Sequence, residues 1–176
     1  LKPNTSVIGP NDPIVYPADA AELSFEAELA VVIKTLAKNV PAERASDVIL
    51  GYTCANDLTV RDAQREESQW FRAKAFDTSC PLGPWIETDL DTANARIRSR
   101  VNGEVKQDGT SADMLRGIPE LIEEITRSTT LLPGDVILTG TPAGVGLVNV
   151  GDTVDIDIDG IGTLTNRIVS PEDLEA

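Results

Sequence analysis

The sequence predicts an α+β fold that is rich in strands and has few helices. Strand patterns dominate both ends of the chain, whereas apolar residues at helical spacing occur in only three short segments. These segments do not alternate regularly with strands, which argues against the parallel sheet of a Rossmann fold. No linker, internal repeat or low-complexity tract divides the chain, so residues 1–176 are expected to form a single domain.

The first half of the chain contains one predicted strand and two predicted helices. Residues 25–33 indicate a strand whose central part is apolar on both faces, as in a buried strand. Residues 41–50 carry apolar side chains at helical spacing. A second helix is predicted over residues 58–67, because Asn56 and Asp57 precede it and are good N-cap residues.

The second half is predicted to contain a hairpin, a helix and two further strands. Residues 101–105 place Asn102-Gly103 between β-forming residues, which is the strongest short-range signal for a hairpin. A helix is predicted over residues 118–127, and strands over residues 136–139 and 154–158, each of which follows a turn.

One segment imitates a calcium site. Residues 155–160 match the first half of an EF-hand loop, but its twelfth position is Asn166 instead of a bidentate Glu. The strict alternation of Asp and Ile is typical of a strand. We therefore expect a strand here and no calcium site.

The charge and the cysteines restrict the partners and the compartment. Fifteen Lys and Arg residues against 29 Asp and Glu residues give a formal net charge of −14. This charge repels phosphate backbones and anionic lipids, so neither nucleic acid nor a membrane is an expected partner. Cys54 and Cys80 lack metal-ligand spacing and the density of a disulfide scaffold, which predicts reduced thiols in a cytoplasmic protein.

The sequence contains no histidine. Ser-His-Asp triads, Cys-His pairs, His-based zinc sites and imidazole acid–base catalysis are therefore excluded within these residues. Chemistry in this chain must depend on carboxylates, lysine, hydroxyls, amides or a hard metal ion.

Glu26 and Glu28 are the sharpest local feature. Side chains alternate faces along a strand, so both carboxylates project from the same face. One interpretation is a solvated strand edge; the other is a metal site, since the strand continues into an apolar segment. Asp57 is a candidate third ligand, with helix N-capping as its alternative role. An all-carboxylate site favours Mg²⁺, Mn²⁺ or Ca²⁺ over zinc or copper.

Lys74 lies in an aromatic segment, residues 70–78. It either snorkels from an amphipathic strand or lies beside the metal, where it would bind a substrate carboxylate or stabilise an oxyanion. The sequence alone does not decide between these roles.

Residues 139–146 form a glycine-rich segment after a predicted strand, without the Gly-Lys-Ser/Thr ending of a phosphate-binding loop. This segment is either a wide turn or a site that presents N–H groups and the Thr141 hydroxyl to an oxyanion.

Taken together, these motifs resemble the catalytic C-terminal domain of the fumarylacetoacetate hydrolase family. The resemblance covers the chain from residue 1 to about residue 169. Each motif is weak alone, but six in this order are highly specific; they are residues 25–32, 51–64, 74–78, 81–85, 101–104 and 138–146.

The resemblance implies a fold, a metal site and catalytic groups. The implied fold is a mixed β-roll with a few helices, usually assembled as a homodimer. The implied ligands of Mg²⁺ or Mn²⁺ are Glu26, Glu28 and Asp57. The implied catalytic and substrate-contacting groups are Lys74, Gln64 and Thr141, with Arg61 also at the substrate and Thr78 in the supporting shell.

The activity implied by the resemblance is divalent-metal-dependent cleavage of a C–C bond in small 2-oxo or 1,3-dioxo acids through an enolate. Acylpyruvate hydrolysis and oxaloacetate decarboxylation are the expected types. The alternative is isomerisation of 2-hydroxyhepta-2,4-diene-1,7-dioate in aromatic-acid catabolism. A non-enzymatic metal-binding remnant is the hypothesis from a different class.

The resemblance also implies a missing part. Family members carry, upstream of this region, a lid segment with a His and a Glu that activate water or relay protons. The sequence begins after that point and has no His. We therefore expect these groups to come from a lid that the 176 residues do not include.

Overall fold

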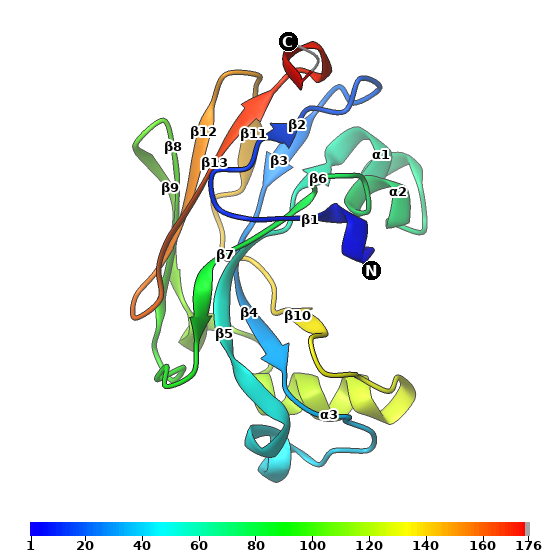
Figure 1. The fold of residues 1–176 in the computed structure, drawn as a ribbon, viewed down its shortest axis with the longest axis vertical. Coiled ribbons are helices and arrows are strands. Elements are labelled where there is room, and N and C mark those ends of the chain that lie inside the picture. The colour runs from blue at the N-terminus through cyan, green and yellow to red at the C-terminus, as the bar shows by residue number, and fades with distance from the viewer. Residues whose placement is uncertain (175–176) are drawn as a thin grey trace.

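The computed structural model describes residues 1–174 and shows a β-rich α+β roll, as predicted from the sequence (Figure 1). A five-stranded sheet at its centre has the order β1-β7-β5-β4-β10. Only β1 and β7 pair in parallel, so the sheet is mixed. Its strands are β1 Val7–Ile8, β7 Cys80–Glu87, β5 Ile49–Asn56, β4 Ala27–Ile33 and β10 Val136–Leu138.

A second five-stranded sheet has the order β2-β13-β12-β8-β9 and packs on the first, with β12 and β13 against β5 and β7, and β8 against β4. A three-stranded sheet, β11-β3-β6, completes the roll. The strands of these two sheets are β2 Ile14–Val15, β13 Gly162–Val169, β12 Thr153–Ile158, β8 Arg96–Val101, β9 Glu104–Thr110, β11 Gly146–Val148, β3 Leu23–Phe25 and β6 Thr59–Val60.

The sheets enclose one apolar core. Alternate residues of β12, Val154, Ile156 and Ile158, are buried against it, and every residue of β4 is buried. This burial explains why β4 has an unbroken apolar run, since strands covered on both faces need no polar alternation. The core fixes β4 and β5 as a rigid base for the polar residues at one end of the pair.

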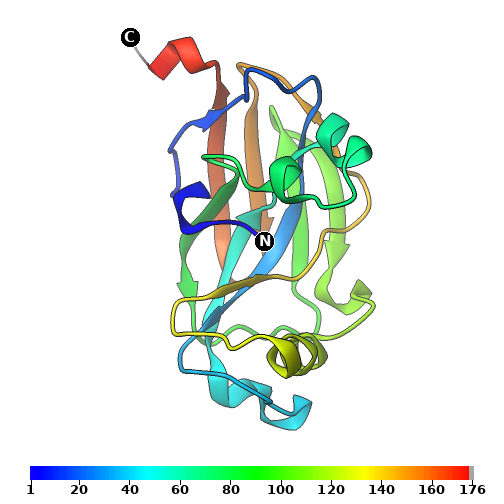
Figure 2. The ribbon, with the colours of Figure 1, turned by 90° about the vertical axis from the view of Figure 1, so that its right-hand side faces the viewer.

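The helices lie at the two ends of the roll. Helices α1 (Arg61–Glu66) and α2 (Phe71–Lys74) pack together at one end, and α3 (Ile118–Ser128) packs with η2 at the other. The N-terminal residues and β10 cross the face between these two groups (Figure 2). The 3₁₀ helices are η1 Asn4–Ser6, η2 Ala42–Val48, η3 Ser111–Asp113 and η4 Pro171–Leu174. Within residues 1–174, no helix has the length and apolar character needed to cross a membrane.

Several predicted elements are confirmed. The hairpin at residues 101–105 joins β8 to β9 with Val101 opposite Glu104, and residues 136–139 contain β10. The predicted helix at 118–127 is α3, whose last residue is Ser128. Residues 155–160, which imitate a calcium loop, run along β12 into a turn, as expected. Cys54 and Cys80 are buried free thiols.

Three boundaries differ from the sequence prediction. The predicted strand 25–33 is interrupted at Glu26, which separates β3 from β4. The helix predicted at 41–50 is the 3₁₀ helix η2, and its last two predicted residues, Ile49 and Leu50, belong to β5. The helix predicted at 58–67 begins only at Arg61, because residues 59–60 pair with β3 instead.

The N-cap role proposed for Asn56 and Asp57 is therefore wrong. The Asn56 side chain accepts the N–H of Glu26 at 3.0 Å, and the Asp57 carboxylate points into a charged cluster. The aromatic segment 70–78 is likewise not a strand: it contains α2 and a turn in which Thr78 has φ 66°. Tertiary contacts have overridden local propensity in both places.

Candidate metal centre and its surroundings

The site is built where β4 begins and its antiparallel neighbour β5 ends. Ala27 and Asn56 are opposite each other in the register, so Glu26, just before β4, and Asp57, just after β5, lie next to each other. The Asp57 N–H donates to the Glu26 carbonyl at 2.9 Å. One carboxylate oxygen from each of Glu26, Glu28 and Asp57 lies within 4.8 Å of the others. The structure thus brings together the three carboxylates that the sequence singled out.

These carboxylates are buried: Glu26 is 7% exposed, Glu28 is 3% and Asp57 is 8%. Three buried charges of the same sign repel each other and need cations nearby. The solvated-edge interpretation of Glu26 and Glu28 is thereby excluded.

Lys74, in the last turn of α2, reaches this cluster directly. Its Nζ donates to Glu26 Oε2 at 2.9 Å, to Asp57 Oδ2 at 2.7 Å and to the Thr59 hydroxyl at 2.9 Å. Burial alone would lower the pKa of Lys74, but the carboxylates of Asp57 and Glu26 outweigh it and raise the pKa above its usual value. Lys74 is therefore a fixed positive charge inside the site, and the snorkelling alternative does not apply.

Arg61 and Gln64 form a second polar arm, presented by α1. The Arg61 guanidinium donates to Glu26 Oε1 at 2.5 Å, to Ser24 Oγ at 3.1 Å and to Gln64 Oε1 at 2.8 Å. Because the Gln64 carbonyl oxygen is occupied by Arg61, its NH₂ group is the part that can face another molecule.

Lys2 is a buried cation whose role the sequence analysis missed. Its Nζ donates to the carbonyl oxygens of Leu58 (3.2 Å), Ser79 (2.8 Å) and Lys74, and lies 2.8 Å from Asp57 Oδ1. Burial lowers the pKa of Lys2 although Asp57 opposes the shift. Lys2 thus links the segments that contain Leu58, Lys74 and Ser79 around the cluster. These contacts are long-range, so no local sequence pattern indicates them.

Glu28 is the least compensated member of the cluster. The Gly140 N–H donates to its Oε2 at 2.6 Å, and among residues 1–174 it forms no ion pair. Burial and the nearby charge of Asp57 raise the pKa of Glu28 to about 8. Additional positive charge beside Glu28 would reverse this shift and favour its ionised form.

The Thr141 hydroxyl is held by a buried network that includes Gln107. Gln107 is fully buried; its Oε1 accepts the Ala27 N–H at 3.0 Å, and its Nε2 donates to Thr141 Oγ1 at 2.7 Å and to the Pro142 carbonyl at 2.8 Å. Thr141 Oγ1 in turn donates to the Ala27 carbonyl at 2.8 Å. The hydroxyl proton is therefore directed away from any oxyanion, and the oxygen retains acceptor capacity only.

The supporting-shell residue Thr78 does not touch the cluster. Its hydroxyl accepts the N–H of Val15 at 3.0 Å, which fastens the turn after α2 to β2. Gln107, like Lys2, had no signal in the sequence, because it lies 80 residues from the peptide it contacts. The N–H of Gly140 fits the expectation that the glycine-rich segment presents backbone donors, although here the donor meets Glu28.

A cavity of about 720 Å³ opens beside Asp57 and Lys74. Its far wall is formed by β10 and the end of α3, and the N-terminal residues line its rim. A small molecule in this cavity would therefore meet Asp57 and Lys74 of the charged cluster.

The donor set fits a divalent cation. The three buried carboxylates have Lys2, Lys74 and Arg61 as cationic partners at Asp57 and Glu26, whereas Glu28 has an ion pair with none of them within residues 1–174. A buried carboxylate such as Glu28 costs free energy in its ionised form unless a cation lies beside it. Carboxylate oxygens are the ligands that hard cations such as Mg²⁺, Mn²⁺ and Ca²⁺ prefer.

The fold and the site together define a class of proteins: a β-rich roll with three buried carboxylates and a lysine at one end of a central strand pair. The chain belongs to the fumarylacetoacetate hydrolase family: residues 1–169 match the family profile "Fumarylacetoacetate (FAA) hydrolase C-terminal". The family resemblance inferred from the six motifs is thereby confirmed.

Two curated relatives illustrate the range of the family. Protein Rv2993c of Mycobacterium tuberculosis is 56% identical over 172 residues, which are 96% of this chain and 65% of that protein. An oxaloacetate tautomerase of Bacillus subtilis is 43% identical over 158 residues, 84% of this chain and 52% of the relative. The chain thus spans about half to two thirds of the length of these relatives.

Solved structures share the fold closely. A 2-hydroxyhepta-2,4-diene-1,7-dioate isomerase from Mycobacterium marinum matches with a TM-score of 0.95 at 54% identity, covering 97% of this chain and 68% of that one. A maleylpyruvate hydrolase from Sphingobium sp. SYK-6, in complex with manganese(II) and pyruvate, matches with a TM-score of 0.88 at 39% identity, covering 96% and 63%.

Proposed function

We propose that this chain is the catalytic domain of a divalent-metal-dependent enzyme that interconverts keto and enol forms, or positional isomers, of small 2-oxo acids. The observation that carries this proposal is the buried cluster of Glu26, Glu28 and Asp57 with the Lys74 ammonium in direct contact. An acidic cluster buried at the edge of a cavity is suited to hold a divalent cation, which together with the Lys74 ammonium would attract an anion that develops further negative charge.

Glu26, Glu28 and Asp57 would hold the metal, for which Mg²⁺ and Mn²⁺ are the leading candidates and Ca²⁺ the third. The manganese bound by the related maleylpyruvate hydrolase supports this assignment. Such an ion supplies Lewis acidity, which polarises a carbonyl group and favours loss of a neighbouring proton.

Lys74 is assigned to charge stabilisation and not to proton transfer. The carboxylates of Asp57 and Glu26 raise the pKa of Lys74 and hold it as an ammonium beside them. Its hydrogen bonds go to two carboxylates and a hydroxyl. A cation that takes over the oxygens of Glu26 and Asp57 would release Lys74 to donate to the oxygen that becomes negative when an enolate forms.

Gln64 and Thr141 suit two different groups of the substrate, its carboxylate and its enol O–H. The NH₂ of Gln64 is a donor for a carboxylate oxygen, oriented by Arg61. Thr141 Oγ1 retains acceptor capacity, so it suits the O–H of an enol better than an oxyanion. In a keto–enol exchange, one proton leaves the carbon beside the carbonyl and one joins the carbonyl oxygen, so the product has the same atoms as the substrate. We assign the proton transfer to the His and Glu of the lid that family members carry.

The relatives favour isomerisation. The sequence analysis had placed C–C bond cleavage first and isomerisation second. An oxaloacetate tautomerase and a dienedioate isomerase, 43% and 54% identical to this chain, support the enol-based reaction. Hydrolysis of an acylpyruvate remains the second candidate, because the 39% identical maleylpyruvate hydrolase was solved with pyruvate. Both reactions pass through an enolate and differ in what then attacks or protonates it.

The test is metal-dependent turnover of the purified full-length protein that contains the lid segment. After removal of metal with a chelator, Mg²⁺ or Mn²⁺ is added back, and the ultraviolet absorbance of enol-oxaloacetate is followed. Acetylpyruvate cleavage and oxaloacetate decarboxylation are assayed in parallel. We expect tautomerisation that requires metal and is lost in Asp57→Asn but not in Asp77→Asn, whose side chain is exposed. Metal binding without turnover of any of these compounds would instead support the non-enzymatic hypothesis.

A further inference from the structure

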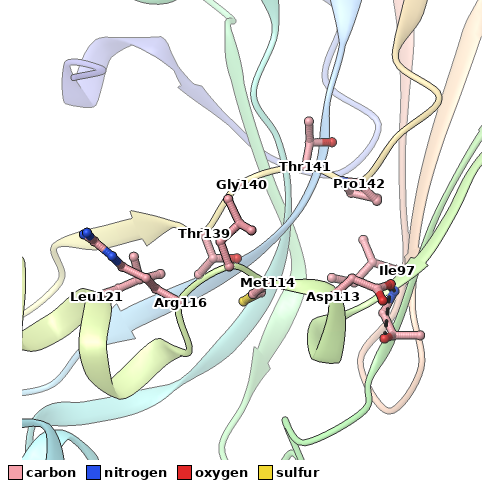
Figure 3. A pocket seen from close by; sticks show the side chains of 11 residues that line it. Ile97, Asp113, Met114, Arg116, Leu121, Thr139, Gly140, Thr141 and Pro142 are labelled. Carbon is pink, nitrogen blue, oxygen red and sulfur yellow. Dashed lines mark hydrogen bonds between the residues drawn. The ribbon is translucent and has the colours of Figure 1, made fainter.

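Two separate cavities flank the glycine-rich segment, and their cations differ. The second cavity, of about 470 Å³, is lined by Arg116 and, on one side, by residues 139–141 (Figure 3). Among residues 1–174 it shares no lining residue with the cavity beside the carboxylate cluster. The cations that line the cavity beside the cluster are Lys2 and Lys74 in the described part of the chain. A ligand at the cluster would therefore meet these two ammonium groups.

The two ammonium groups differ in what holds them. The three hydrogen bonds of Lys2 all go to backbone carbonyl oxygens. Those of Lys74 go to the carboxylates of Glu26 and Asp57 and to the hydroxyl of Thr59. A cation bound by the carboxylates would compete with Lys74 for two of these three partners. The Thr59 oxygen is the partner that remains available to the ammonium.

The Thr59 hydroxyl is fixed both in position and in polarity. Thr59 is fully buried in β6, where it is paired with Ser24 of β3. Its single proton is donated to the Asp57 carbonyl at 3.0 Å. Toward Lys74, whose Nζ lies 2.9 Å away, the oxygen is therefore an acceptor. Branching at Cβ restricts rotation of the side chain, so this acceptor holds the ammonium at one place.

The backbone of Lys74 is attached to the same segment. Its carbonyl oxygen accepts from Lys2 Nζ and, at 2.9 Å, from the Ser79 hydroxyl. Lys2 Nζ also donates to the carbonyl of Leu58, the residue before Thr59, at 3.2 Å. Helix α2, which carries Lys74, packs against β6. Both the backbone and the ammonium of Lys74 are thus fastened to the strand that contains Thr59.

We propose that Thr59 is a positioning residue that holds the Lys74 ammonium in place when a cation occupies the carboxylates. This inference rests on the proposed function and adds a residue to it. Without the hydroxyl, a cation at the carboxylates would displace the ammonium from all of its side-chain partners. Loss of the hydroxyl should therefore weaken both cation binding and the stabilisation of an enolate, and it should do so only through Lys74.

The test is a double-mutant cycle on Thr59 and Lys74. Thr59→Val keeps the branched shape without the hydroxyl, Thr59→Ser keeps the hydroxyl, and each is combined with Lys74→Met. The bond to the Asp57 carbonyl is lost in both backgrounds and cancels in the cycle. The control is Thr53→Val: Thr53 is likewise buried in a strand and donates to the Gly83 carbonyl at 3.0 Å, without a hydrogen bond to Lys74 in the described residues.

The first readout is Mn²⁺ affinity, measured by calorimetry after treatment with a chelator. We expect Thr59→Val to weaken Mn²⁺ binding about threefold to tenfold more with Lys74 present than in Lys74→Met, up to the usual value of one hydrogen bond to a charged group. Thr59→Ser and Thr53→Val should bind Mn²⁺ like the unaltered protein. An equal effect of Thr59→Val in both backgrounds, or none in either, overturns the inference. If Thr59→Val does not fold, Thr59→Cys takes its place, because a thiol is a weak acceptor of similar size.

The second readout is kcat for tautomerisation by the full-length protein that contains the lid segment. We expect kcat to fall about tenfold in Thr59→Val, to recover in Thr59→Ser, and to fall no further when Thr59→Val is added to Lys74→Met. A further tenfold fall in the Lys74→Met background overturns the positioning role and leaves the proposed function intact. Absence of metal-dependent turnover in the unaltered protein overturns the proposed function itself.

Discussion

Lys74 is the residue at which a catalytic and a structural role predict different outcomes. Lys74→Met keeps the apolar stem but removes the ammonium that contacts Glu26 and Asp57. We expect kcat for tautomerisation to fall about 10²–10³-fold, the usual effect of losing one preorganised donor to a developing oxyanion. Metal affinity should stay equal or increase, because the removed positive charge repels a cation.

The control for this prediction is Arg72→Met on the same helix. Arg72 pairs with Glu67 on the exposed side of α2, so its loss should change neither kcat nor metal affinity. Steady-state kinetics and metal titration by calorimetry provide the two readouts. Unchanged turnover in Lys74→Met would contradict the role assigned to its ammonium.

Gln107 makes a prediction about stability. Gln107→Leu removes the acceptor of the Ala27 N–H and both donors to the glycine-rich segment. A buried donor without a partner costs about 1–3 kcal/mol, so the free energy of unfolding should fall by that amount. Urea unfolding measures this loss, with the exposed Gln69→Leu as control. Equal midpoints for the two variants would show that Gln107 does not hold this segment.

At the scale of elements, sequence patterns predicted what a local signal determines. The Asn102-Gly103 turn, the amphipathic helix α3 and the strand β12 each have a short-range cause, and each was found where expected. The helix predicted to follow Asp57 begins later than expected for the opposite reason. Residues 59–60 pair with β3, a partner more than 30 residues away, and this pairing outweighs the capping preference of Asn56 and Asp57.

The candidate site shows the same difference between features with a short-range cause and features that depend on long-range contacts. The alternation of side chains along a strand predicted that Glu26 and Glu28 lie together, and both reach the cluster although the strand is interrupted at Glu26. Their meeting with Asp57 depends on the β4–β5 register, and the contacts of Lys2 and Gln107 span 55 and 80 residues along the chain. No local pattern encodes contacts of that range, so the support of the site emerged only from the fold.

The aspartates of β12 and the turn after it are the alternative place where a metal could bind, and they can be compared with the carboxylate cluster. Asp155 accepts the Thr165 hydroxyl at 2.6 Å, and Asp157 and Asp159 pair with Arg98, so these carboxylates have partners without a cation. We expect Asp155→Asn to leave metal stoichiometry and affinity unchanged, whereas Asp57→Asn abolishes tight binding. Equilibrium dialysis against Mn²⁺ distinguishes the two positions. Loss of bound metal in Asp155→Asn would place a site in the segment that imitates a calcium loop.

The whole molecule combines a strongly acidic surface with unusually exposed apolar side chains. The formal net charge is −14, yet Trp70, Phe71 and Trp85 are each more than half exposed and Leu115 is fully exposed. Contiguous exposed apolar groups such as Trp70 and Phe71, which are adjacent in the chain, mark interaction sites, and two-fold dimers are the commonest assembly of soluble proteins. We therefore retain the homodimer as the expected assembly.

The net charge gives this prediction a direction that can be measured. Two copies of an acidic chain repel each other, and salt screens that repulsion over a Debye length of about 30 Å at 0.01 M but about 8 Å at 0.15 M. Apolar contacts are not weakened by this screening, so the dissociation constant of the dimer should fall as salt rises between these two concentrations. Sedimentation equilibrium at micromolar protein measures both states. A mass of 18.8 kDa at both concentrations would contradict the dimer. A dimer that weakens with salt would show that opposite charges, and not the apolar side chains, hold its interface.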